Sequence, residues 1–242
     1  MSLASKPAFL TEDLARQALI DLCLRFAPLG LNQGKSGNAS LRWHRGGEEG
    51  LLITPSGLDY ETTRPDDIVW IALEQPCETE ADQDILAPPR RRDGARAPSS
   101  EWRMHRDILA SYPAAQAIVH VHSAHATSLA CLPRIQREGI PAFHYMVAVA
   151  GGVDIRCARY ATFGTQALSD AALEALRGRR ACLLANHGQI AWGANLAQAL
   201  ALALEIEMLA RQYWQVLQLG EPALLDEAEM ARVLTAFGRY GR

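Results

Sequence analysis

The sequence predicts an α/β fold with a largely antiparallel or mixed sheet that helices cover on both faces. Two apolar runs, Ile118–His122 and Ala181–Ala185, have the length and composition of buried strands. Amphipathic runs that begin at capping residues are mixed with such strands along the chain. Many elements are joined by tight glycine turns instead of regular crossover helices, which favours antiparallel or mixed pairing.

The N-terminal half is predicted to hold one helix followed by three strands. Thr11 can cap the helix, since two acidic residues follow it, and Pro28 or Gly30 should end it. Alternating apolar residues predict the three strands, which are expected at residues 37–43, 51–54 and 67–73.

The stretch 74–98 is expected to be the least ordered part of the chain. Its first half is acidic, and Pro88-Pro89 and Arg90-Arg91-Arg92 follow. The arginines could contact an anion or a partner, but a solvated surface loop explains them as well, and the composition favours the loop.

The C-terminal half alternates helices and strands around Ile118–His122. Residues 141–149 are predicted to be a strand-like segment that Gly151-Gly152 closes. The other expected elements are a helix from Pro98 to near Pro113, a helix over 123–132, a helix capped by Ser169 that runs to Leu176, strands at 181–185 and 189–192, a helix capped by Asn195 that stops at Gly220, and a helix over 226–237.

Composition narrows the functional classes. No linker divides the 242 residues, so one domain over 1–242 is expected. The net charge of −3 gives no reason to expect nucleic acid as a partner. No apolar run could span a bilayer and no signal-peptide pattern is present, so no membrane partner is expected. Five scattered cysteines favour a reducing compartment, and a cytoplasmic location is expected.

Two histidines of the central strand predict a metal site. Side chains alternate along a strand, so His120 and His122 should share one face. His187, in a turn after another apolar strand, is the expected third ligand, and His125 competes with it. Three neutral imidazoles leave one coordination position open, which is the pattern of catalytic zinc.

Other polar residues have both a structural and a functional interpretation. Glu101 can complement the dipole of a helix start, or can act at the metal as a ligand or as a general acid/base. Ser99-Ser100, Thr54–Gly57 and Gly37-Asn38 can serve as caps and turns, or can bind a phosphate. No nucleotide-binding glycine pattern is present.

Seven motifs resemble, in order and over nearly the whole chain, the class II aldolase/adducin-head family. They are GLNQGKSGNASLR from Gly30, ITPSG from Ile53, SSEWRMH from Ser99, VHVH from Val119, IPAFHYM from Ile140, YATFGT from Tyr160 and NHG from Asn186.

The resemblance implies a three-layer α/β/α sandwich and a homotetramer with active sites at subunit interfaces. It implies Zn²⁺, or another divalent metal, held by His120, His122, His187 and Glu101, with Glu101 also as catalytic acid/base. Tyr145 would donate a proton from a neighbouring subunit. The substrate phosphate would be bound by Asn38, Ser56, Gly57, Ser99 and Ser100. The aldehyde pocket would be shaped by Phe163, Phe237 and Tyr240.

The implied reaction is reversible retro-aldol cleavage of a small phosphorylated sugar, a ketose phosphate such as fuculose phosphate. The products would be dihydroxyacetone phosphate and a small aldehyde, by way of a metal-bound enediolate. Alternatives within the family are a sugar-acid phosphate decarboxylase, a 4-epimerase or a dehydratase, and Tyr145 favours the aldolase. A non-catalytic adducin-like assembly domain would have no need of the histidines and Glu101. Lys35 departs from the small hydroxyl residue of the family pattern.

Overall fold

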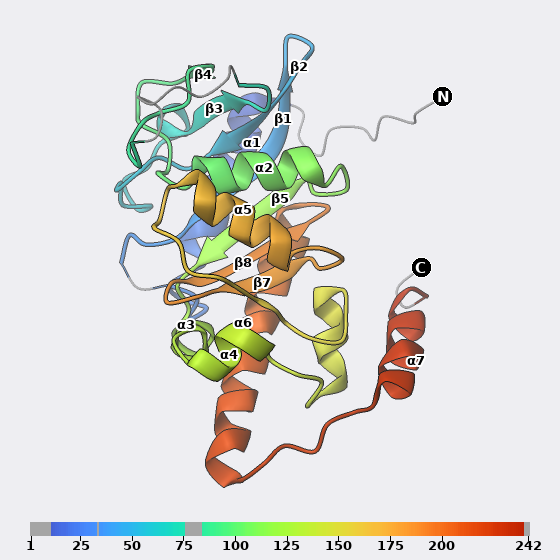
Figure 1. The fold of residues 1–242 in the computed structure, drawn as a ribbon. Coiled ribbons are helices and arrows are strands. Elements are labelled where there is room, and N and C mark those ends of the chain that lie inside the picture. Colours follow the sequence, from blue (N-terminus) through green and yellow to red (C-terminus); the bar gives the residue numbers. More distant parts are fainter. Residues whose placement is uncertain (1–10, 33, 76–83, 240–242) are drawn as a thin grey trace.

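An eight-stranded sheet forms the centre of the molecule (Figure 1). The computed structural model describes residues 11–32, 34–75 and 84–239. The strands of this part are β1 (Asn38–Arg45), β2 (Glu48–Ile53), β3 (Val69–Ala72), β4 (Arg92–Asp93), β5 (Ala117–Val121), β6 (Cys157–Ala158), β7 (Ala181–Leu184) and β8 (Gly188–Gly193). Their order is β4-β3-β2-β1-β5-β8-β7-β6. Every neighbouring pair is antiparallel except β6 and β7, which are parallel.

Helices cover both faces of the sheet. They are α1 (Glu12–Leu24), α2 (Trp102–Ser111), α3 (Ala124–Ala130), α4 (Pro133–Glu138), α5 (Gln166–Ala175), α6 (Leu196–Leu219) and α7 (Glu227–Phe237), with 3-10 turns η1 (Pro65–Asp67) and η3 (Tyr145–Ala150). Figure 1 shows α2 and α5 on one face and α6 on the other. The structure therefore confirms the expected three layers and the mixed sheet.

Alternation along the strands produces two separate cores. Leu52 and Val119 point into the core beneath α1 and α6, whereas Leu51 and Ile118 point into the core beneath α2 and α5. Successive side chains of a strand face opposite sides, so each strand serves both layers. Figure 1 shows how the same sheet separates the two helical layers.

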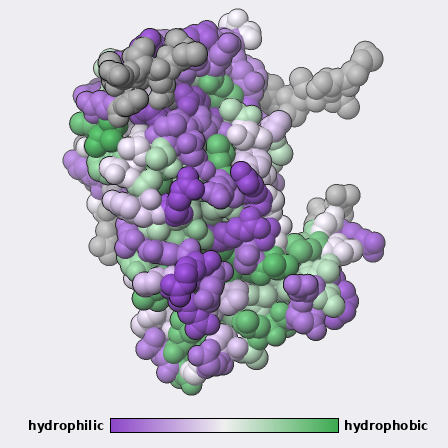
Figure 2. All heavy atoms as spheres, viewed as in Figure 1, coloured by the Kyte–Doolittle hydropathy of each residue, from purple (hydrophilic) through white to green (hydrophobic). Residues whose placement is uncertain are grey.

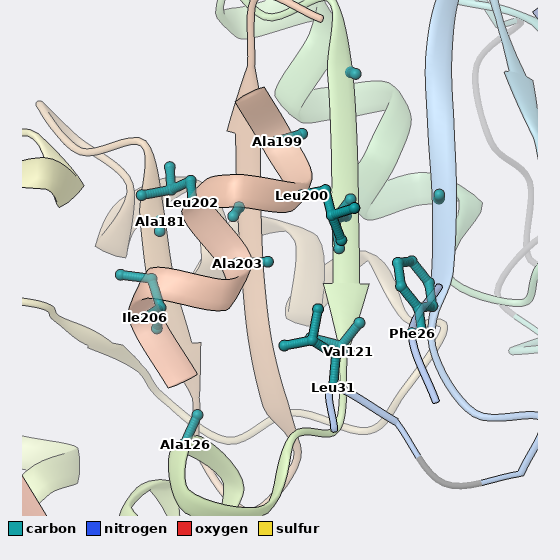
Figure 3. Close-up of a cluster of buried hydrophobic side chains, with 14 of the residues drawn as sticks. Phe26, Leu31, Val121, Ala126, Ala181, Ala199, Leu200, Leu202, Ala203 and Ile206 are labelled. Carbon is teal, nitrogen blue, oxygen red and sulfur yellow. The ribbon is translucent and has the colours of Figure 1, made fainter. Parts of the chain in front are cut away.

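Small residues let α6 lie close to the sheet. Figure 3 shows Ala199, Leu200 and Ala203 of α6 beside β5 and β8, with Val121 near the end of β5. All four residues are buried. Burying one Leu or Val side chain contributes about 1.5–3 kcal/mol, so this contact firmly anchors the end of β5.

The segment 141–149 was predicted to be strand-like, and this prediction is wrong. The structure has η3 over Tyr145–Ala150, begun by His144, whose Nδ1 accepts a hydrogen bond from the backbone of Met146 (3.1 Å). It ends at Gly151, whose φ of +102° favours glycine. Short apolar runs do not separate strands from buried helical turns, which explains the error.

Several helix boundaries also differ from the prediction. Thr165 caps α5 through the backbone N–H of Leu168 (3.3 Å), and Ser169 lies buried inside that helix. The first helix ends at Leu24, before the expected stop, and turns continue to Gly30. The structure also contains α4, β4 and β6, which the sequence did not reveal because each is only a few residues long.

The last helix packs on the 3-10 turn η3. Met230 of α7 is buried, and Val233, Leu234 and Phe237 are partly buried against the same core. Figure 2 shows hydrophobic side chains gathered between η3 and α7. Among the described helices, none is both long enough and apolar enough to cross a membrane.

Candidate metal centre

Three histidine rings and one carboxylate meet where β5 and β8 adjoin. His120 and His122 lie at the end of β5, and the β7–β8 turn carries His187. Because β5 and β8 are antiparallel, with Val121 opposite Gln189, the end of one strand adjoins the start of the other. The ring centroids lie 4.8–4.9 Å apart. The expected shared face of the His pair and the choice of His187 therefore agree with the structure.

Glu101 completes the cluster from the start of α2. One candidate ligand atom from each of the four residues lies within 4.8 Å of the others. The Oε2 atom of Glu101 is 3.0 Å from Nε2 of His120, and Oε1 is 3.2 Å from Nε2 of His187. Of the two interpretations of Glu101, the structure therefore favours the one at the histidine cluster.

The donor atoms fit a divalent cation. Nδ1 of His120 donates to the backbone carbonyl of Gln189 (2.8 Å), which leaves the lone pair of a neutral ring on Nε2. That atom is 3.0 Å from Nε2 of His122. Oε1 of Glu101 is buried and has no hydrogen-bond partner. Several lone pairs directed at one another in a buried space are repulsive unless a proton on His120 or a metal cation lies among them.

Electrostatics leave two of the rings neutral. Burial, followed by the nearby His120, lowers the pKa of His122 to about 3 and of His187 to about 4. Burial disfavours charge on Glu101 as well, but the attraction of His120 outweighs it and holds the pKa of the carboxyl below its usual range. Burial likewise opposes charge on His120, yet the Glu101 carboxylate raises its pKa. Neutral imidazoles beside a carboxylate are the forms that bind metal.

The turn that carries His187 has an unusual backbone. Asn186 adopts φ of +54°, a left-handed conformation that asparagine tolerates better than most residues. Its backbone N–H donates to the carbonyl of Ala130 (3.1 Å), and its side-chain oxygen accepts from Gln136 (2.9 Å). These contacts hold the turn against α3 and α4.

His125, the competing third ligand, lies outside the cluster. Its Nδ1 is 2.7 Å from Oε1 of Glu207, and both carboxylate oxygens of Glu207 also accept backbone N–H groups at the start of α3. The carboxylate thus caps α3 from α6, and His125 belongs to that cap.

The three small polar loops converge on Thr54. The backbone N–H of Thr54 donates to the carbonyl of Ala39 (3.1 Å), and the carbonyl of Thr54 accepts from the backbone N–H of Ser99 (2.9 Å). The backbone N–H of Ser56 donates to Ala97 (3.0 Å), and Pro55 pairs with Pro98. This brings together the loops that carry the residues expected at a phosphate, namely Asn38, Ser56, Gly57, Ser99 and Ser100. Ser56 and Gly57 are exposed, whereas Ser99 is buried.

Asn38, one of the residues expected at the phosphate, makes hydrogen bonds to two other buried side chains. It is the first residue of β1, and its Nδ2 donates to Oε2 of Glu101 (2.9 Å). Its Oδ1 lies 2.5 Å from Nε2 of the fully buried His105. His105 lies four residues after Glu101, a spacing that places both on one side of a helix and is a signal that the sequence contains.

The expected proton donor Tyr145 and the expected pocket residue Phe163 are 53% and 47% exposed. Phe237 is partly buried in the contact of α7 with η3. Tyr240 lies outside the described residues.

A mixed α/β sheet with a buried cluster of one glutamate and three histidines at strand ends defines a metal-dependent enzyme. Residues 17–214 match the family described as Class II Aldolase and Adducin N-terminal domain. The chain therefore belongs to this family and is an enzyme of the class II aldolase type.

Similar proteins carry more specific names. The 5-methylthioribulose-1-phosphate/5-deoxyribulose-1-phosphate aldolase of Rhodospirillum rubrum is 51% identical over 226 residues, 93% of this chain and 92% of that protein. The L-fuculose phosphate aldolase of Escherichia coli K12 is 43% identical over 229 residues, 94% and 95% of the two chains. A solved structure of L-fuculose 1-phosphate aldolase has a TM-score of 0.80 at 37% identity and covers 96% of this chain and 100% of its own.

Proposed function

We propose that this enzyme cleaves a ketose 1-phosphate to dihydroxyacetone phosphate and a small aldehyde, with Zn²⁺ as the metal. The observation that carries the proposal is the convergence of His120, His122, His187 and Glu101. The compared relatives with assigned activities act on phosphorylated ketoses. We propose 5-methylthioribulose 1-phosphate or 5-deoxyribulose 1-phosphate as the first substrates to test, because the Rhodospirillum aldolase shares more residues than the fuculose phosphate aldolases compared.

The three histidines would hold the metal and Glu101 would move the proton. When bound, the metal supplies a Lewis acid that stabilises negative charge on the substrate oxygens. The carboxylate of Glu101 is ionised at neutral pH and is held by the Asn38 amide at Oε2, which leaves Oε1 unpaired for a proton. Burial excludes water from this transfer.

The substrate phosphate would lie where the three loops converge on Thr54. Ser99 and Ser100 precede the ten-residue helix α2, and the adjoining loop presents the hydroxyl of Ser56 and the backbone N–H of Gly57. Such groups at a helix start favour an anion. Lys35 is exposed on the loop before β1 and adds a positive charge to that side.

Tyr145 would complete the site from a neighbouring subunit of a homotetramer. Its ring is half exposed and stacks on His144, with centroids 4.8 Å apart. A tyrosine so exposed supports a role in trans as the proton donor to the leaving aldehyde oxygen. Phe163 supports the same interface, since it is also half exposed.

Mixed tetramers test this arrangement. The Tyr145→Phe and His122→Ala enzymes should each be inactive alone. If equal amounts are unfolded and reassembled together, about a quarter of the sites combine an intact metal centre with an intact neighbouring tyrosine, and activity should return to about that level. If verified mixed tetramers recover no activity, Tyr145 and His122 act in the site of the same chain, and the proposed role of Tyr145 in a neighbouring subunit is wrong.

The substrate proposal is tested by following dihydroxyacetone phosphate with a coupled NADH assay. The zinc-loaded enzyme is given 5-methylthioribulose 1-phosphate, 5-deoxyribulose 1-phosphate and L-fuculose 1-phosphate, and the first two should have the higher kcat/KM. Release of carbon dioxide from a sugar-acid phosphate, or epimerisation at C4 without cleavage, would replace the aldolase with another enzyme of the family. Higher kcat/KM for fuculose 1-phosphate would correct only the substrate.

A further inference from the structure

Four buried polar side chains form a continuous line from β1 to the proposed metal centre. Oγ of Ser40 lies 2.8 Å from Nδ1 of His105, and Nε2 of His105 lies 2.5 Å from Oδ1 of Asn38. Nδ2 of Asn38 lies 2.9 Å from Oε2 of Glu101. All four residues are buried, two of them completely. Each group therefore depends on its neighbour, and not on bulk water, for its hydrogen bond.

Only one set of hydrogen-bond directions along this line is compatible with an ionised Glu101. An ionised Glu101 can only accept, so Asn38 must turn its NH2 group toward it and its carbonyl oxygen toward His105. That oxygen also only accepts, so Nε2 of His105 must carry a proton. The ring of His105 is fully buried and its side-chain partners are a hydroxyl and an amide, neither of them charged, so the ring stays neutral and Nδ1 accepts from the Ser40 hydroxyl.

The backbone around Asn38 is already fixed by other contacts. The carbonyl of Gly37 accepts from the hydroxyl of Tyr60 (2.8 Å), and the backbone of Ala39 pairs with Thr54. Asn38 itself pairs with His120 in the β1–β5 register. The orientation of the amide remains undetermined by the backbone, and only its two hydrogen-bond partners decide it.

We propose that His105, which carries its proton on Nε2 and accepts from Ser40 at Nδ1, is a positioning residue that holds the Asn38 amide, and through it the Glu101 carboxylate, in this orientation. This inference rests on the proposed function, because Glu101 is the proposed acid/base. With the amide so oriented, one N–H holds Oε2 of Glu101, and the second N–H of the same nitrogen stays available to a substrate oxygen. A flipped amide would direct its oxygen at the carboxylate and would lose both donors.

Two substitutions at position 105 separate positioning from the filling of space. His105→Gln keeps an N–H donor near the place of Nε2, whereas His105→Leu fills similar volume without a donor. The Leu variant should lose about 10–100-fold in kcat or in metal affinity, as is usual when a partner of a metal ligand is removed, with a small change in KM. The Gln variant should recover most of that loss at a similar Tm. Equal loss in both variants would overturn the proposal.

A serine pair supplies the matched control. Ser40→Ala leaves the buried Nδ1 of His105 without its hydrogen-bond donor, and kcat should fall several-fold. Ser169→Ala removes an equally buried hydroxyl that donates to Asp107 (2.6 Å) on α2, away from the line, and should keep the wild-type kcat. The same fall in kcat for both serine variants would indicate a general loss of packing and would contradict the proposal.

The tautomer itself can be observed without any assay of activity. In ¹⁵N-histidine-labelled wild-type protein, the His105 signals, assigned by their loss in His105→Gln, should show a protonated Nε2 and a bare Nδ1. A protonated Nδ1 would overturn the proposal. If the tautomer is as expected but no ketose phosphate is cleaved, the proposed function fails, and the metal affinities of the Gln and Leu variants still decide whether His105 positions Glu101.

Discussion

Gly188 leaves no room for a side chain beside the ring of His122. A Cβ atom at position 188 would be 3.0 Å from Cδ2 of that ring and 2.5 Å from the carbonyl oxygen of Val121. Real side chains do not approach backbone oxygens so closely, so any residue larger than glycine must displace the end of β5. The glycine after His187 is thus a packing requirement of the metal centre and not only a turn residue.

Gly188→Ala should therefore weaken metal binding. The added methyl group pushes on β5 and moves His122 out of line with the other two rings, and overpacking of this kind costs about 1–3 kcal/mol of stability. Elemental analysis should find less zinc per chain, and Tm should fall. Gly238→Ala is the matched control, since a Cβ there meets nothing closer than 3.4 Å. Full zinc content in Gly188→Ala would contradict this account.

Removal of one imidazole should empty the site. His122→Ala leaves His120, His187 and Glu101, one donor fewer, and the zinc content of the purified protein should fall from about one per chain to near zero. His44→Ala, at a ring that is 62% exposed, should keep its metal. If His122→Ala retains the wild-type zinc content, His122 is not a ligand.

Neutralising Glu101 should abolish most of the catalysis. Glu101→Gln keeps the size of the side chain and an oxygen that can accept from Asn38, but it cannot carry a proton. Its kcat should fall by about 10²–10⁴-fold, the usual range for loss of a general acid/base. The kcat is measured at saturating zinc, so that weaker binding of the metal is not mistaken for lost chemistry. A kcat within a few-fold of wild type would remove Glu101 from the proton transfer.

The metal-free protein should lose stability as the pH falls below about 6. Burial lowers the pKa of His105 and His122 to about 3 and of His187 to about 4. Their ordinary value is about 6.5, so between roughly pH 6 and pH 4 the unfolded chain binds up to about three more protons than the folded chain. Each such proton lowers the free energy of unfolding by about 1.4 kcal/mol per pH unit.

Two neighbouring groups, His120 and Glu101, do not reverse this loss of stability at low pH. The raised pKa of His120 keeps this residue protonated in both states over the same pH range, so its contribution is lost only at higher pH. Glu101, with its lowered pKa, adds stability above its ordinary value of about 4.5 that is lost as the pH falls further. Urea unfolding of chelator-treated protein at several pH values measures the slope. A flat profile would contradict the burial of these rings.

Much of the site followed from local patterns. Strand periodicity placed His120 and His122 on one face, and an apolar strand before Asn186-His187-Gly188 indicated a third ligand. The shared face of His120 and His122 is confirmed, because a period of two residues is a property of the backbone itself. The role of the three histidines as metal ligands stays a prediction. The strand expected at 141–149 failed because a short apolar run suits a 3-10 turn equally well until its neighbours are known.

The sequence by itself determined the alternation of helices and strands, the two-residue spacing of the histidine pair and the polar loops that flank Glu101. Only the tertiary structure decided that Glu101 joins the histidines, that His125 instead binds Glu207, and that Asn38 and His105 form a line to the carboxylate. Residues 38 and 101 are far apart in the chain, and no local propensity encodes a hydrogen bond between them. That contact arises when β1 pairs with β5 and α2 packs over the sheet. The packing of these elements sets the distance between Asn38 and Glu101, which neither segment determines alone.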